Sequence, residues 1–232
     1  MGLLIDRFEL FRDGFLLTLQ LCVVAGLIAL LLGTIAATLR VSPLPPLRAV
    51  GTAYVTLFRN VPLTVVMFFV VFGLPALGSQ ARFLAIPGLD ILFPRLTIDL
   101  PYFRLTALAL AVYTGAFVCE GLRSGINAVP AGQAEAARAL GLSFVQNLRH
   151  VVLPQAFRAS VVPIGSVIVA MIKNSALAGF FGLVGDLMQT ADVLTSQEGQ
   201  PLIPVFIGIS IGYLVMTIPL GITLDRVEKG RK

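Results

Sequence analysis

Long apolar segments separated by short polar ones dominate the sequence. A helix needs roughly 20 apolar residues to cross the hydrocarbon core of a bilayer. The pattern predicts about five transmembrane helices, over residues 15–39, 61–77, 105–123, 159–181 and 202–224. The segment 83–101 is also apolar, but prolines interrupt it and Asp90, Arg95 and Asp99 charge it. We expect that segment to form a loop at the membrane face.

The N-terminus has the pattern of a retained span. The first apolar run, about 25 residues long, exceeds the 7–15 residues typical of a signal peptide, and the segment before it has mixed charge. Leu4, Phe8, Phe11 and Phe15 recur at helical spacing. Residues 3–13 therefore form either a short amphipathic helix on the membrane surface or a frayed terminus.

The composition agrees with a chain that is mostly embedded in the lipid bilayer. Of 232 residues, 57% are hydrophobic and 12% are charged, whereas a soluble domain carries about 25% charged residues. We predict an all-α integral membrane protein with residues 1–232 as a single transmembrane domain. The net charge of +5 does not indicate nucleic acid, because the basic residues form no stripe. Cys22 and Cys119 lie in apolar runs and give neither a disulfide framework nor metal-ligand spacing.

The distribution of lysine and arginine predicts the orientation. With the N-terminus outside, eleven basic residues fall on cytoplasmic segments and five on outer segments. The loop 182–201 carries Asp186, Asp192 and Glu198 with no basic residue. Because cytoplasmic loops are enriched in basic residues, we expect an outside N-terminus and a cytoplasmic C-terminus. The eleven are Arg40, Arg48, Arg59, Arg123, Arg138, Arg149, Arg158, Arg226, Lys229, Arg231 and Lys232.

Sequence signatures of catalysis are missing. There is no G-x-x-x-x-G-K-[ST] loop, no metal-ligand cluster and a single histidine, His150. Five spans leave no room for a catalytic domain, so we predict that the chain is not an enzyme. The energy for any transport must come from another chain or from an ion gradient. The chain resembles half of an assembly, which suggests pairing.

The segment 132–157 is too polar to cross the bilayer and is predicted to lie at the inner face as a helical hairpin. Residues 133–149 are rich in good helix formers. Gly141 interrupts them, and Ser143 follows as a candidate cap for a second helix. Pro154 suits a chain that turns toward the next span. A cytosolic partner could bind such an element.

The same segment resembles the EAA loop of ABC-importer permeases. The matching positions are Glu135-Ala136-Ala137, Gly141 and Leu153-Pro154, with Val151 where the pattern usually has isoleucine. In that family this loop forms coupling helices that dock in a cleft of the ATPase subunit. The resemblance implies a type I (MetI-like) importer permease fold. It also gives the ATPase-coupling role to Glu135, Ala136, Ala137, Gly141, Leu153 and Pro154.

Further similarity covers most of residues 50–180 and points to the polar amino-acid branch of these permeases. It rests on YVTLFRNVPLT at 54–64, YTGAFVCEGLRSGI at 113–126, PQAFR at 154–158, Val162-Pro163 and IKNS at 172–175. RVSP at 40–43, FRNVPLT and LRSGIN look most like glutamate-type permeases. The resemblance implies a cytosolic ATPase homodimer, a second permease that is sister or identical, and an extracytoplasmic amino-acid-binding protein. ATP and magnesium would bind the ATPase subunits, and this chain would bind no cofactor.

Lys173 is the one basic residue deep within a predicted span. A charge at the bilayer centre costs about 2.5–3.5 kcal/mol, so Lys173 should face the interior of the assembly. It either pairs with an acid in this or the partner permease, which we favour, or meets an anionic substrate, or extends to the interface. Where the branch often has Lys-Asp-Thr-Ser, this chain has Lys173-Asn174-Ser175-Ala176. Lys173, Asn174 and Ser175 are the candidates for a translocation path.

Two smaller features complete the candidates. Glu120 lies three residues before Arg123, so we expect a local salt bridge or a contact with the EAA-type loop. Two G-x-x-x-G pairs, Gly121/Gly125 and Gly208/Gly212, permit close helix approach. The second pair is a candidate for the contact between two permeases.

Two rival functions stay open at this stage. An ion-driven secondary transporter would show inverted repeats and broken helices with buried acids. A membrane scaffold without transport activity would leave the EAA-type pattern unexplained.

Overall fold

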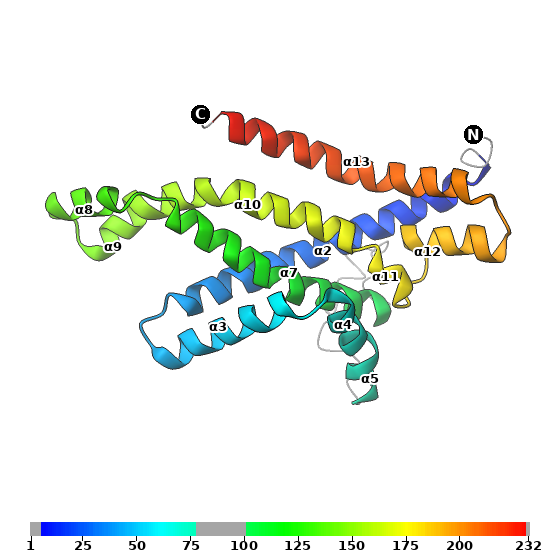
Figure 1. Cartoon of the computed structure of the whole chain (residues 1–232), viewed down its shortest axis with the longest axis horizontal. Helices are drawn as coiled ribbons and strands as arrows, with labels where there is room; N and C mark the ends of the chain where they lie inside the picture. The colour runs from blue at the N-terminus through cyan, green and yellow to red at the C-terminus, as the bar shows by residue number, and fades with distance from the viewer. Residues whose placement is uncertain (1–5, 78–100, 231–232) are drawn as a thin grey trace, which may run out of the picture.

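The computed structural model describes residues 6–77 and 101–230, except for the side chains at positions 144, 145 and 148. All regular structure in these residues is helical (Figure 1). The elements, in chain order, are α2 (Phe8–Arg40), α3 (Pro45–Asn60), α4 (Leu63–Phe68), η1 (Phe69–Gly73), α5 (Leu74–Ala76), α7 (Pro101–Asn127), α8 (Ala131–Ala139), α9 (Phe144–Asn147), η4 (Leu148–Val152), α10 (Leu153–Asn174), α11 (Leu177–Phe180), α12 (Leu187–Asp192), η5 (Val193–Gln197) and α13 (Leu202–Lys229).

Four helical stretches in the described part of the chain are long and apolar enough to cross a membrane: Phe8–Arg40, Pro101–Asn127, Arg149–Phe180 and Leu202–Lys229. A fifth span results if the pair Pro45–Asn60 and Leu63–Ala76, bent by 107°, is counted as one. The expectation of an all-helical fold with about five spans is confirmed. The predicted apolar segments lie largely within these helices, although the segment 61–77 begins at the break between α3 and α4. The membrane boundaries stay predictions.

Helix α3 is the main element that the apolar pattern did not predict. Pro45 and Pro46 occupy its first positions, where a missing N–H costs nothing. The helix ends where Val61 adopts an extended conformation, which the following Pro62 favours. Arg48 and Arg59 interrupt the hydropathy of this segment. The region around 45–60 is therefore a helix beside α2 and α7 rather than a simple loop (Figure 1).

Residues 8–13 continue the first span as one helix. Helix α2 runs without interruption from Phe8 to Arg40, so this part of the predicted surface helix is not a separate element. Phe11 is buried while Phe8 is 61% exposed. The expected loop at 83–101 falls outside the described residues, apart from its last residue, which begins α7.

Helices α2, α7 and α10 pack closely through small residues. A Cβ on Gly33 of α2 would lie 2.8 Å from the Gly115 carbonyl oxygen of α7. A Cβ on Gly125 of α7 would lie 2.5 Å from the Ala156 carbonyl oxygen of α10. Backbone atoms cannot yield at these distances, so glycine is required for the helices to approach so closely. The pair Gly121/Gly125 thus serves packing inside the chain.

Gly212 of α13 also packs within the chain. A Cβ there would lie 2.5 Å from a methyl carbon of Leu187. Gly212 is buried by its own chain, so the candidate role of Gly208/Gly212 in a contact between two permeases is wrong for Gly212.

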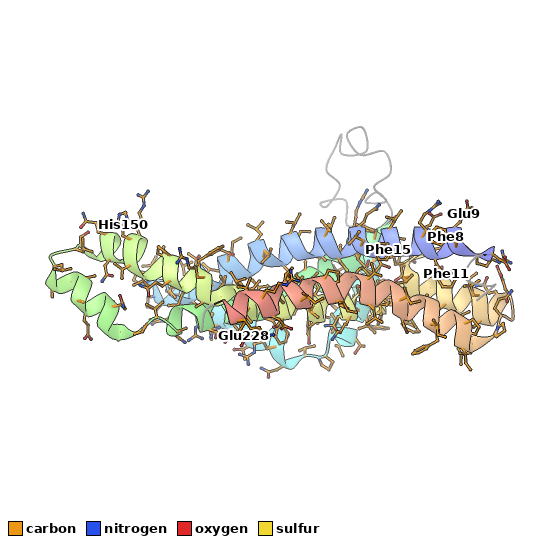
Figure 2. All side chains as sticks on the ribbon, turned by 90° about the horizontal axis from the view of Figure 1, so that it is seen from above. Phe8, Glu9, Phe11, Phe15, His150 and Glu228 are labelled. Atoms are coloured by element: carbon orange, nitrogen blue, oxygen red, sulfur yellow. The ribbon has the colours of Figure 1, made fainter. Side chains whose placement is uncertain are left out.

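The bundle is elongated, and its connections collect at two ends (Figures 1 and 2). The turn between α2 and α3, the α8–α9 hairpin and the C-terminal end of α13 lie toward one end. The N-terminal end of α2 and the segment α11–α12 lie toward the other, where Arg7 pairs with Glu198 at 2.8 Å. His150 and Phe8 mark opposite ends in Figure 2. Polar connections thus collect on two separate faces, as a multi-pass protein requires.

Candidate functional site

The first helix of the predicted hairpin, α8, ends in a Schellman motif around Gly141. The Gly141 N–H donates to the Arg138 carbonyl at 2.9 Å, and the Leu142 N–H donates to the Ala137 carbonyl at 3.2 Å. Gly141 has φ of +85°, a conformation that costs little only for glycine. The predicted glycine turn is confirmed, and its hydrogen bonds satisfy carbonyls that would otherwise lack partners.

The second helix, α9, starts with a reciprocal cap. The Gln146 N–H donates to the Ser143 hydroxyl oxygen at 3.3 Å, and the Ser143 N–H donates to the Gln146 side-chain oxygen at 2.9 Å. This is the capping-box arrangement of a serine with a glutamine three residues later. The prediction that Ser143 caps the second helix is confirmed.

Asn147 fastens the two short helices to each other. Its side-chain nitrogen donates to the Ala134 carbonyl at 2.8 Å, and the residue is only 5% exposed. After Asn147 the chain continues through η4 into α10 without leaving a helical conformation. The role of Asn147 could not be predicted from the sequence, because a single polar residue in a polar segment gives no signal of burial.

The EAA-type residues divide between the outer face of the hairpin and its interior. Glu135, Ala136 and Gly141 are exposed, whereas Ala137 is only 5% exposed. Leu153 is 46% exposed and Pro154 is also exposed, at the start of α10. Leu140, beside the turn, is 84% exposed. The hairpin thus presents Glu135, Ala136, Leu140 and Gly141 on its outer face.

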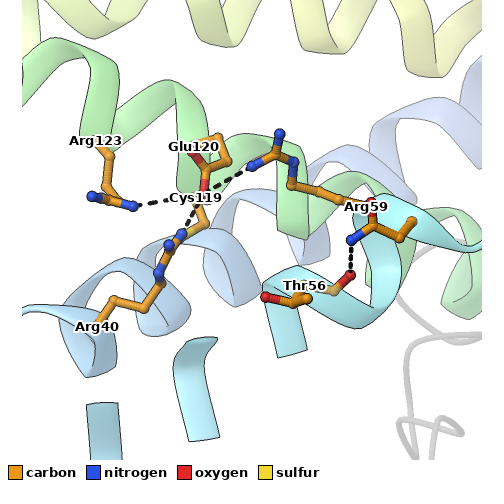
Figure 3. Close-up of polar contacts among 7 residues, drawn as sticks. Arg40, Thr56, Arg59, Cys119, Glu120 and Arg123 are labelled. Atoms are coloured by element: carbon orange, nitrogen blue, oxygen red, sulfur yellow. Dashed lines mark hydrogen bonds and ion pairs between the residues drawn. The ribbon is translucent and has the colours of Figure 1, made fainter. Parts of the chain in front are cut away.

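Glu120 of α7 joins three helices rather than only its neighbour on the same helix (Figure 3). It accepts a hydrogen bond from Arg40 of α2, and it lies 3.4 Å from Arg59 of α3 and 3.9 Å from Arg123. The expected Glu120–Arg123 pair is present, but it is the longest of the three. Arg40 and Arg59 are far from Glu120 in sequence, so helical spacing could not reveal them.

Lys173, Asn174 and Ser175 lie at the end of α10 and face different surroundings. Lys173 is exposed on the wall of a cavity of about 620 Å³. The rest of the wall comes mainly from α12 and α13. Asn174 lines a separate cavity of about 140 Å³ between α7 and α10. Ser175 is fully buried and donates to the Ile172 carbonyl at 2.7 Å.

The expected pairing of Lys173 with an acid is not formed within the described chain. No carboxylate among residues 6–77 and 101–230 makes an ion pair with Lys173. Lys173 also lies in the last turn of α10 rather than in mid-helix. Asp192 contributes to the same cavity wall.

Asp186 forms a buried polar junction at the end of the bundle opposite the hairpin. It caps α12 by accepting a hydrogen bond from the Gln189 N–H at 2.7 Å, and it has no exposed surface. Its Oδ2 atom has no hydrogen-bond partner among the described residues. Burial raises the pKa of Asp186 to about 7, although backbone N–H groups near the carboxylate oppose the shift.

The segment around Asp186 is shaped for close packing. Gly182 and Gly185 have φ of +94° and +87°, and a Cβ on Gly179 would lie 2.5 Å from Asp186 Oδ1. The Leu187 N–H donates to the Thr18 hydroxyl oxygen of α2 at 3.0 Å. The sequence placed Asp186 in an acidic outer loop and did not indicate that it is buried.

The apolar helical bundle, with four to five helices long enough to cross a membrane, is that of a multi-pass membrane protein. The family model described as "Binding-protein-dependent transport system inner membrane component" matches residues 29–231. The chain belongs to this family. It is therefore a multi-pass component of the inner membrane and a transport subunit without its own ATPase site or cofactor. Membership implies ATPase subunits and a binding protein in the complete ABC importer.

Individual proteins show the same relationship. The chain is 39% identical over 216 residues to the glutamate transport system permease protein GluC of Corynebacterium efficiens, covering 93% of this chain and 91% of the relative. It is 36% identical over 228 residues to the probable glutamine ABC transporter permease protein GlnM of Bacillus subtilis, covering 98% and 96%. A crystal structure of an amino acid ABC transporter with histidines matches with a TM-score of 0.82 at 30% identity, covering 97% of this chain and 96% of that one.

We predict that thermal stability depends on the protonation of Asp186. The folded-state pKa lies above the ordinary value of 3.8, so the folded protein binds more protons than the unfolded chain between these two values. Stability is therefore greatest at low pH and falls as pH rises toward about 7. We expect the melting temperature of the purified protein to fall by several degrees between about pH 5 and pH 8, and Asp186→Asn to remove most of this change.

The control is Asp192→Asn, which removes an exposed carboxylate from the same segment. This variant should keep the pH dependence of the original protein. Equal pH slopes in Asp186→Asn and the original protein would contradict the assignment.

Proposed function

We propose that this chain is the permease subunit of an ATP-driven importer for polar amino acids, with glutamate as the transported substrate. The observation that carries the proposal is the capped, exposed hairpin α8–α9 at one end of the bundle. The substrate class is supported by the names of relatives, which include a glutamate permease and a probable glutamine permease. RVSP at 40–43, FRNVPLT and LRSGIN favour glutamate within that class.

The contacts of the hairpin make it rigid, so a push on it would move the helices attached to it rather than deform the hairpin. Both of its short helices are capped, Asn147 joins them, and η4 continues directly into α10. Movement of the hairpin by a closing ATPase dimer would therefore displace α10 as a rigid body. Because Gly125 brings α7 against α10, the displacement would reach α7 as well. Glu135, Ala136, Gly141, Leu153 and Pro154 form the exposed coupling surface in this mechanism, and the buried Ala137 supports it from inside the hairpin.

The assembly consists of two permeases, which are sister or identical chains, together with an ATPase homodimer that binds ATP and magnesium. An extracytoplasmic protein delivers the amino acid. The two permeases alternate between outward-open and inward-open states as the ATPases close and separate. Chemistry on ATP takes place in the partner subunits.

The hairpin end of the bundle is the cytoplasmic end in this proposal. It carries Arg40, Arg48, Arg138 and Arg149, and the C-terminal end of α13 lies toward the same side. The opposite end combines the N-terminal end of α2 with the acidic segment around Asp186. Basic residues concentrate on cytoplasmic segments, so the N-terminus lies outside.

Lys173, Asn174 and Ser175 are our candidates for the translocation path. The Lys173 ammonium group has no ion-pair partner in the described chain and lies on the wall of the 620 Å³ cavity. An unpaired cation in such a place attracts the carboxylates of an acidic amino acid. Asn174 faces a different cavity, so it would act at a separate step or in a different conformation.

A gradient-driven transporter and a scaffold are the alternatives to an ATP-driven permease. We expect uptake of labelled glutamate by proteoliposomes that contain the complete transporter to require ATP at the hairpin side. Unlabelled glutamate should compete at least tenfold better than arginine. Uptake by this chain alone, driven by an ion gradient, would favour a secondary transporter, and an isolated chain that purifies without an ATPase would favour the scaffold.

Coupling should fail when the turn or the carboxylate of the hairpin is altered. Gly141→Ala forces a residue with a Cβ into φ of +85°, at a cost of about 1–2 kcal/mol, and Glu135→Ala removes an exposed carboxylate. We expect either change to reduce transport-coupled ATPase activity at least tenfold while the protein still inserts. The matched control is Gly132→Ala on the same hairpin, where a Cβ meets nothing within 4 Å and φ is not positive.

Cysteine labelling at the hairpin gives an independent readout of its position. Ala136→Cys should react with an impermeant maleimide in inside-out vesicles and not in intact cells. Labelling from outside in intact cells would overturn both the orientation and the coupling role. Normal coupling in Gly141→Ala and Glu135→Ala would overturn the coupling role alone.

Lys173 should affect substrate handling rather than folding. Because Lys173→Met keeps the length of the side chain and removes its charge, we expect a KM for glutamate at least tenfold higher, with Lys173→Arg partly restoring it. Lys229→Met, in the last turn of α13, should leave uptake unchanged. An unaltered KM in Lys173→Met would remove this residue from the path.

A further inference from the structure

A basic pocket lies where the end of α2, the start of α3 and the end of α7 meet, toward the hairpin end of the bundle. Its volume is about 330 Å³, and Arg40, Arg48 and Arg123 contribute to its wall. Neither the coupling role nor the translocation path uses it. Figure 3 shows two of these arginines, Arg40 and Arg123, directed toward Glu120 from different helices.

The positive charge of this pocket is only partly neutralised. Of the arginines on the pocket wall, Arg40 and Arg123 contact Glu120. Glu120 already accepts a hydrogen bond from Arg40 and also lies 3.4 Å from Arg59. Arg123 reaches it only at 3.9 Å. Arg48 is exposed and makes no ion pair with any residue that the structure describes. An additional anion in the pocket would meet Arg48, which has no ion pair in the described chain, and Arg123, whose contact with Glu120 is the longest of the three.

The pocket is also bordered by apolar surface. Val41 and Ile126 line it and are 63% and 37% exposed. Leu44 and Leu47, on the turn before α3 and in its first turn, are 58% and 40% exposed. A soluble anion gains nothing from this border, whereas a phospholipid can place its phosphate among the arginines and its acyl chains against Val41 and Ile126. Basic pockets between transmembrane helices on the cytoplasmic side are suited to such head groups.

We propose that this pocket binds the phosphate head group of an anionic phospholipid from the leaflet on the hairpin side. The guanidinium groups of Arg48 and Arg123 hold the phosphate, since arginine pairs with phosphate through two parallel hydrogen bonds. The Thr52 hydroxyl, also on the wall, is a further donor. The bound lipid would connect α3 to α7 beside the Glu120 cluster. This binding does not depend on which substrate the transporter carries.

The test measures lipid retention by native mass spectrometry on the complete transporter in neutral detergent. Phosphatidylglycerol and phosphatidylcholine are titrated separately, and inorganic phosphate is added as a competitor. The double variant Arg48→Gln/Arg123→Gln is compared with Arg226→Gln/Lys229→Gln, which removes two basic residues from the last turn of α13, outside the pocket. A basic residue near an anionic surface contributes about fivefold in affinity.

We expect the pocket variant to need at least tenfold more phosphatidylglycerol for the same retention, while its phosphatidylcholine retention and the α13 control stay unchanged. Inorganic phosphate at millimolar concentration should not displace the lipid. Equal phosphatidylglycerol retention in the pocket variant and the original protein would overturn the proposal. Displacement by inorganic phosphate would also overturn it, because the occupant would then be a free anion.

Discussion

Close contact between helices is the constraint on which this structure depends. Lipid supplies no hydrophobic force between helices, so they associate through van der Waals contact and hydrogen bonds. Gly33 lets α2 lie against α7, and Gly125 lets α7 lie against α10. A Cβ atom added at either glycine would lie within 3 Å of a carbonyl oxygen of the facing helix. The hairpin leaves α7 at one end and enters α10 at the same end. One of these close contacts, at Gly125, therefore joins the two helices that a displaced hairpin would move.

Glu120 complements this packing with charge. One carboxylate connects α2, α3 and α7 through Arg40, Arg59 and Arg123. These side chains are partly exposed, so the ion pairs contribute less than buried ones would. Their main effect is on arrangement: α3 lies beside the bundle although its apolar character is weak. The positive charge that Glu120 leaves unneutralised lies beside these helices, on Arg48.

The sequence predicted those features that depend on local patterns. Apolar length predicted four helices well, and the Gly141 turn and Ser143 cap followed from residue type alone. Features that depend on distant partners were not predictable. The apolar pattern missed α3 because Arg48 and Arg59 lower its mean hydropathy. In the structure Arg59 lies beside Glu120 of α7, and Arg48 lines the neighbouring pocket. Asp186 resembled a solvated loop residue, since nothing near it in sequence shows that α2 and α13 cover it.

The helix break before Asp186 lies in the segment between two candidate spans, Arg149–Phe180 and Leu202–Lys229. A buried backbone N–H or C=O group needs a hydrogen-bond partner. At Asp186 the carboxylate caps α12, and Thr18 accepts from the Leu187 N–H. Both partners are side chains, and Thr18 belongs to another helix. The chain can therefore break its helix here only while α2 stays in place, so the irregular end and the closely packed bundle stabilise each other.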